Sequence, residues 1–66
     1  MIVQYVENPQ FANESLTLIN CNVKFAEFDN FLPFTASGSD PMEYGRQIYT
    51  DLVNGVYGPI APYVAP

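Results

Sequence analysis

The side chains of this sequence that could take part in chemistry are a few carboxylates, one cysteine and several serines. Two acidic pairs have a spacing that acid–base catalysis uses, Glu27 with Asp29 and Asp40 with Glu43. A turn explains the first pair and a helix start explains the second. The sequence contains no histidine, so Cys21 and the serines lack the usual general base. We therefore expect no catalytic residue, no cofactor and no small-molecule substrate.

Metal and phosphate sites are not indicated either. No loop has the spacing of calcium ligands. The glycines at positions 55 and 58 do not follow a phosphate-loop pattern and are better explained as a helix stop followed by a turn.

The length of the chain limits how it can be stabilised. Sixty-six residues form a single small domain, residues 1–66, with a core close to the lower limit for independent stability. Cys21 is the only cysteine, so no disulfide can form within the chain, and we expect it to be a small buried apolar residue. Aromatic residues make up 15% of the sequence, which is more than a small sheet and one helix readily cover. Oligomerisation is the remaining aid to stability, and we expect a homo-oligomer.

The charge balance bears on the class of partner. The net charge is −5, and Lys24 and Arg46 are the only basic residues. The chain has no basic patch, which argues against nucleic-acid binding and against binding to anionic lipid. No apolar run reaches the length of a membrane span, so no membrane contact is expected. The acidic residues are dispersed, as expected for solvated surface charges.

The clearest element in the sequence is a helix over residues 41–54. Asp40 is the expected N-cap, Pro41 suits the first helical position, and Glu43 completes a capping-box pattern. Gly55 follows Asn54 and can take the left-handed conformation that ends a helix. Apolar and small residues recur at steps of three and four and form one face: Met42, Gly45, Ile48, Tyr49, Leu52 and Val53.

Three strands are expected, over residues 2–6, 16–25 and 31–35. Pro9 is expected to break the first strand. Alternation in the second strand places apolar and polar residues on opposite sides, which is typical of an antiparallel sheet with one wet face. Pro33 places the third strand at an edge of the sheet.

The proline-rich residues 57–66 are expected to run extended and to dock on a surface. The predicted fold is therefore α+β: a small antiparallel sheet of two or three strands, with one amphipathic helix packed on one face and an extended C-terminal tail.

Two neighbouring residues in the helix are unusual. Glycine at position 45 costs about 1 kcal/mol relative to alanine, which suggests the close approach of a strand or of another helix. Arg46 either forms an exposed pair with Glu43 or Asp51, or anchors a loop or a partner through a bidentate bond.

Several segments together resemble small proteins of tailed bacteriophages and prophages. These proteins are encoded near tail-fibre genes or form the N-terminal part of tail-fibre-assembly-like proteins. The resemblance covers almost the whole chain and rests on NPQFA (8–12), FLPFTA (31–36), Asp40 with GRQI (45–48), and GVYGPIAPYV (55–64). It implies a phage origin and a protein-binding role, and it provides no catalytic residue. In the longer relatives a charged helical region follows the final prolines.

The expected function is thus non-enzymatic: a phage tail or tail-fibre component, or an assembly partner, that binds other phage proteins and self-associates. The alternative is an acidic phage effector that inhibits a host protein, acting as a nucleic-acid mimic. The expected location is the host cytoplasm, with incorporation in the virion as the other possibility. The candidate contact residues are the surplus aromatics, the tail and the helical arginine: Phe11, Phe28, Tyr44, Arg46, Tyr57, Ile60 and Tyr63.

Overall fold

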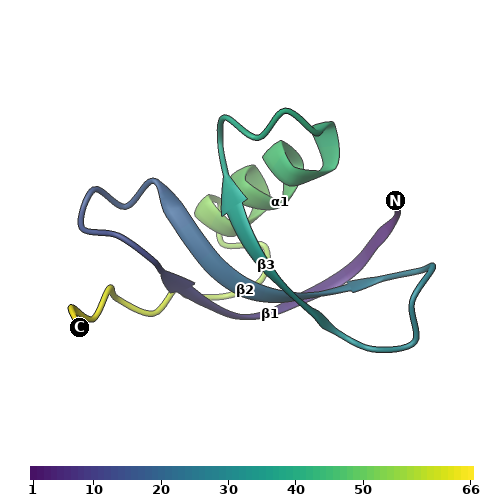
Figure 1. The fold of residues 1–66 in the computed structure, drawn as a ribbon, viewed down its shortest axis with the longest axis horizontal. Helices are drawn as coiled ribbons and strands as arrows, with labels where there is room; N and C mark the ends of the chain where they lie inside the picture. Colours follow the sequence, from purple (N-terminus) through teal and green to yellow (C-terminus); the bar gives the residue numbers. More distant parts are fainter.

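Three strands and one helix follow one another along the chain. The computed structural model describes residues 1–66 and contains β1 (Val3–Phe11), β2 (Leu18–Phe25), β3 (Leu32–Ser37) and α1 (Glu43–Val53). The strands form a single antiparallel sheet with β2 in the middle, and α1 lies on one side of it (Figure 1). The predicted α+β class is confirmed, and the antiparallel sheet has three strands where two or three were expected.

The core is built on the alternating side chains of β2. Ile19 and Val23 are fully buried, while Asn20 between them on the strand is exposed. From the helix, Ile48 and Leu52 belong to the same buried cluster. Each such aliphatic side chain contributes about 1.5–3 kcal/mol when it leaves water. The whole cluster consists of Val6, Ile19, Cys21, Val23, Phe25, Ala36, Ile48 and Leu52.

The first strand is longer than the sequence predicts. Pairing with β2 continues through Pro9 to Phe11, so the prediction that Pro9 ends the strand was wrong. The register shifts between Glu7 and Gln10, where Asn8 has a φ of 54°. Asparagine tolerates this left-handed conformation, so a β-bulge forms there and Pro9 is buried. Because Pro9 lies on an edge strand, its missing N–H removes no hydrogen bond to β2.

The other two strands differ from their predicted bounds at the ends. The second strand begins at Leu18 instead of residue 16, because Leu16 has a φ of 58° and lies in the turn before it. The side-chain oxygen of Asn13 holds this turn by accepting from the N–H groups of Thr17 and Leu18. The third strand extends to Ser37, and it is an edge strand, as Pro33 predicted.

The helix begins two residues later than expected. Met42 occupies the N-cap position and makes no side-chain cap bond, so Asp40 is not the N-cap. The Asp40 carboxylate instead accepts from the Met42 N–H at 2.8 Å, which fixes the turn just before the helix. That carboxylate lies over Gly45, where an added Cβ would overlap Oδ2 and lie 2.5 Å from Cγ. The close approach that Gly45 permits is thus made by the preceding loop, and not by a strand or a second helix.

The helix ends at Val53, one residue before the predicted end, and Gly55 follows it as the predicted stop. Gly55 has a φ of 79°, and its N–H donates to the Leu52 carbonyl. The Val56 N–H donates to the Asp51 carbonyl. These two bonds form a Schellman motif, which satisfies carbonyls that the last turn would otherwise leave open.

After the helix the chain returns to the sheet and touches the free edge of β1. Ala61 forms an isolated parallel bridge with Gln10. The Ala61 N–H donates to the Pro9 carbonyl at 2.9 Å, and the Phe11 N–H donates to the Ala61 carbonyl at 3.0 Å. The Gln10 side chain adds a bond to the Pro62 carbonyl. The C-terminal segment passes beside β1 in Figure 1.

We predict that Ala61→Pro lowers the free energy of unfolding by about 1 kcal/mol, because it removes the N–H that binds Pro9. Urea titration measures the change. Ala65→Pro is the matched control, since Ala65 makes no hydrogen bond in the structure, and it is expected to leave the midpoint unchanged. Equal effects of the two prolines would mean that the bridge does not hold the segment.

The effect of Gly45→Ala should change sign with the residue at position 40. In the natural chain, overpacking against Asp40 costs about 2 kcal/mol. This outweighs the gain of about 1 kcal/mol from alanine in a helix. In an Asp40→Gly background the overlap is gone, so Gly45→Ala should stabilise. Thermal or urea unfolding of the four chains measures the coupling, and a stabilising Gly45→Ala in the natural chain would contradict it.

Candidate protein-interaction surface

Exposed apolar side chains gather at the end of the molecule that holds the N-terminus and the β2–β3 loop. Tyr5, Phe28 and Phe31 are 52%, 44% and 39% exposed. The rings of Tyr5 and Phe31 meet edge to face with centroids 6.5 Å apart. Ile2 is 68% exposed and lies beside the loop, because its carbonyl accepts from the Ala26 N–H. We call Ile2, Tyr5, Phe28 and Phe31 the aromatic end.

Lys24 fastens this end from the polar side of β2. Its ammonium donates to the carbonyls of Phe25, at 2.7 Å, and Phe28, and to Gln4 Oε1 at 3.3 Å. The loop that presents Phe28 is therefore tied to the strand before it. A loop held in this way loses little further freedom when a partner binds.

Glu27 ties the same loop to the start of β1. Its carboxylate accepts from the Ile2 N–H at 3.2 Å. This hydrogen bond, together with one from its own backbone N–H, lowers the pKa of Glu27 below its usual value, and nearby positive charges act in the same direction. Glu27 is thus explained as a loop anchor.

Of the seven predicted contact residues, only Phe28 lies in the aromatic end. Tyr44 is half-buried and packs against core aromatics, with its ring centroid 5.7 Å from that of Phe25 and 6.3 Å from that of Phe34. Tyr57 is also half-buried and meets Tyr5 edge to face at 5.8 Å. Part of the aromatic surplus is therefore covered within the subunit.

Tyr44 and Tyr57 nevertheless share a surface feature. Both line a groove of about 260 Å³ beside the first residues of β1, and the other lining residues are Met1, Val3, Gln47, Ile48 and Asp51. Burial raises the pKa of Tyr57 above its usual value, and the nearby Asp51 and Tyr5 add to the effect. The groove is mainly apolar, so it suits an apolar side chain of a partner.

The remaining predicted contact residues lie elsewhere. Phe11 and Ile60 are half-buried against the core where the C-terminal segment meets β1. Tyr63, further along that segment, is half-buried. Arg46 is exposed, and its guanidinium donates one hydrogen bond to the Asp40 carbonyl at 2.7 Å, so it contacts the loop before the helix without the bidentate bond that was expected. The structure does not gather these residues into one site.

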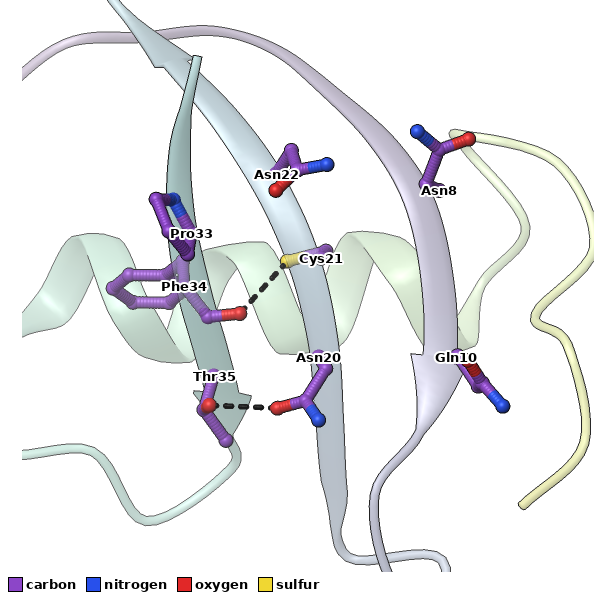
Figure 2. A pocket seen from close by; sticks show the side chains of 8 residues that line it. All are labelled: Asn8, Gln10, Asn20, Cys21, Asn22, Pro33, Phe34 and Thr35. Atoms are coloured by element: carbon purple, nitrogen blue, oxygen red, sulfur yellow. Dashed lines mark hydrogen bonds between the residues drawn. The ribbon is translucent and has the colours of Figure 1, made fainter. Parts of the chain in front are cut away.

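A second feature lies on the polar face of the sheet. Amide and hydroxyl side chains line a shallow depression of about 410 Å³ (Figure 2). Thr35 Oγ1 on β3 donates to Asn20 Oδ1 on the neighbouring strand β2 at 2.7 Å. The polar side chains around it are Asn8, Gln10, Asn20, Asn22 and Thr35. The depression holds hydrogen-bond donors and acceptors, and the one titratable residue in its lining is Cys21.

Sequence reasoning did not select the residues of this depression, nor Tyr5 and Phe31. The alternation of Asn20, Asn22 and Lys24 along β2 was the signal for the depression, because it placed them on the wet face. The contribution of Asn8 and Gln10 depended on the bulge in β1, which the sequence did not indicate.

No group of three or more histidine, cysteine, aspartate or glutamate residues is placed to hold a metal ion. The helix is neither long nor apolar enough to cross a membrane. Cys21 is buried, and its thiol donates weakly to the Phe34 carbonyl at 3.5 Å. Burial raises the pKa of the Cys21 thiol to about 11, so it is protonated at neutral pH.

Comparison of the chain with protein-family models, with curated proteins and with solved structures found no match. The resemblance to phage tail-fibre-associated proteins therefore stays a prediction.

The raised pKa of Cys21 predicts a loss of stability in alkali. The unfolded thiol ionises near its ordinary pKa of 9.0, whereas the folded thiol stays protonated until about pH 11. Between these values the unfolded state binds fewer protons, so the free energy of unfolding falls as the pH rises. Urea titration at several pH values measures the free energy of unfolding of the natural chain and of Cys21→Ser. The difference between the two chains removes the contribution of the tyrosines, which both contain. A difference that is constant from pH 8 to pH 11 would contradict the assignment.

Proposed function

We propose that this chain is a non-enzymatic protein-binding module of a bacteriophage or prophage, a tail or tail-fibre component or an assembly partner, which also self-associates. The observation that carries the proposal is the aromatic end. Monomeric proteins expose single apolar residues commonly, but the exposed ring pair of Tyr5 and Phe31, with Phe28 in the same loop as Phe31 and packed on Phe25, is typical of an interaction surface. The phage assignment rests on the resemblance described above.

The composition of the aromatic end suits a protein partner. Tyrosine and phenylalanine are enriched in the cores of protein interfaces, while charged residues are depleted there. Lys24, the basic residue nearest to this end, is already occupied by two carbonyls and an amide oxygen. The partner is thus expected to bind through apolar contacts rather than through a charge pair.

In this proposal the helix covers one face of the sheet, and the proline-rich residues 57–66 run as an extended arm. The groove lined by Tyr44 and Tyr57 lies beside the start of β1, near the aromatic end, and extends the contact. Binding occurs in the host cytoplasm during assembly, and the protein either leaves or stays in the virion.

The test is calorimetric titration of the purified chain with the purified tail-fibre protein encoded by the same phage. Phe28→Ser should weaken the complex by about tenfold or more, because truncation of an aromatic anchor removes a large share of interface energy. Val64→Ser is the matched control, since Val64 is 69% exposed and lies outside the aromatic end. It should bind as the natural chain does.

Two results would count against the proposal. One is a titration with no measurable heat of binding, together with no co-elution of the chain and the fibre protein at micromolar concentration. The other is an equal loss of affinity in the two variants, which would mean that the aromatic end is not the contact.

A further inference from the structure

The two edges of the sheet are protected very differently. The β1 edge has two register shifts, a buried proline and a hydrogen-bonded cover from Ala61. The β3 edge has continuous pairing with β2 from Leu32 to Ser37, without a bulge. None of its side chains is charged. Natural sheets normally block such an edge with charges, prolines, bulges or a covering segment, and of these devices β3 has only Pro33.

The backbone groups on this edge can be assigned from the alternation of the ladder. The Ala12 N–H donates to the Leu18 carbonyl, so Leu18 faces β1 and Ile19 faces β3. Ile19 pairs with Ala36, and the pairing runs without interruption along β3. Ala36 and every second residue before it therefore bond to β2. The backbone N–H and C=O groups of the residues between them point away from the sheet. These outward residues are Pro33, Thr35 and Ser37, of which Pro33 has no N–H.

Two of these outward residues have complementary gaps. Pro33 has a carbonyl but no N–H. Ser37 has an N–H, but its carbonyl already accepts from the Asp40 N–H at 3.3 Å. If a second copy of β3 pairs antiparallel about an axis at Thr35, Pro33 lies opposite Ser37 of that copy. Pro33, which has no N–H, then faces the Ser37 carbonyl, which already accepts a hydrogen bond. The Ser37 N–H can donate to the free Pro33 carbonyl.

We propose that β3 pairs with β3 of a second copy about a two-fold axis at Thr35, so that the sheet continues across a homodimer. In this register Thr35 exchanges both backbone bonds with Thr35 of the second copy. Phe34 lies opposite Ala36, a large side chain beside a small one on the helix side of the sheet. The absence of charge on β3 lets two chains of net charge −5 meet without repulsion at the contact. The inference rests on the self-association in the proposed function and assigns it a surface separate from the aromatic end.

The test removes one backbone donor and leaves the rest of the strand in place. Thr35→Pro deletes the outward N–H, and Thr35→Val keeps it while losing the side-chain bond to Asn20. Sedimentation equilibrium of the natural chain should approach twice its mass of 7.4 kDa as the concentration rises from micromolar to millimolar. Thr35→Pro should raise the dimer dissociation constant by about tenfold or more, and Thr35→Val should leave it within about threefold.

Amide hydrogen exchange gives a second measurement that does not depend on how Thr35→Pro folds. In the natural chain the Thr35 and Ser37 amides should become protected as concentration rises. The Ala36 amide should be protected at every concentration, because it bonds within the subunit. A chain that stays monomeric at millimolar concentration overturns the proposal. So does a dimer in which the Thr35 and Ser37 amides exchange freely, or one that a folded Thr35→Pro variant still forms.

The Phe28→Ser variant separates this inference from the proposed function. It should weaken binding to the fibre protein and leave the dimer unchanged, while Thr35→Pro should weaken the dimer and leave binding at the aromatic end unchanged. A dimer abolished by Phe28→Ser and unchanged by Thr35→Pro would move self-association to the aromatic end and overturn the β3 assignment.

Discussion

The structure depends on burying one side of the middle strand. Every second residue of β2 enters the core, and the fully buried Ile19 and Val23 share one cluster with Ile48 and Leu52 of the helix. With no disulfide and no metal group, this apolar cluster is the main source of stability in a chain of 66 residues. The requirement also explains the polar side of β2, because residues that alternate with buried ones must face water.

A three-stranded sheet has two edges, and the two edges of this sheet differ in how their backbone groups are paired. On the β1 side, the bulge at Asn8 turns a proline inward and gives Ala61 a carbonyl to bind. The C-terminal segment is therefore attached at the edge where the ladder is irregular. On the β3 side the ladder is regular and uncharged, so pairing with a further strand needs no rearrangement of this chain. Open edges are a liability unless a specific partner covers them, and the complementary gaps at Pro33 and Ser37 favour a second copy in one register.

The polar groups outside the core mostly hold loops in place. Lys24 binds the β2–β3 loop, Asp40 holds the turn before the helix, and Asn13 closes the turn after β1. Two of these residues, Lys24 and Asp40, are charged, and both are engaged in holding loops. Phe28 and its neighbours are thus presented by a tied loop, which reduces the entropy that binding must overcome.

The sequence by itself determined the class of fold, the middle strand, the edge position of β3 and the left-handed glycine that ends the helix. Each of these follows from a local rule: side-chain alternation, the missing N–H of Pro33, or the freedom of Gly55 at positive φ. Only the tertiary structure decided that β1 continues through Pro9, because a bulge is stable there only when β2 and Ala61 pair with the strand on both sides. The same is true of Gly45, whose close neighbour proved to be Asp40, and of the aromatic end, where Tyr5 of β1 meets Phe31 of the β2–β3 loop. Residues far apart in sequence come together only when the register of the strands is set, and no local pattern records that register.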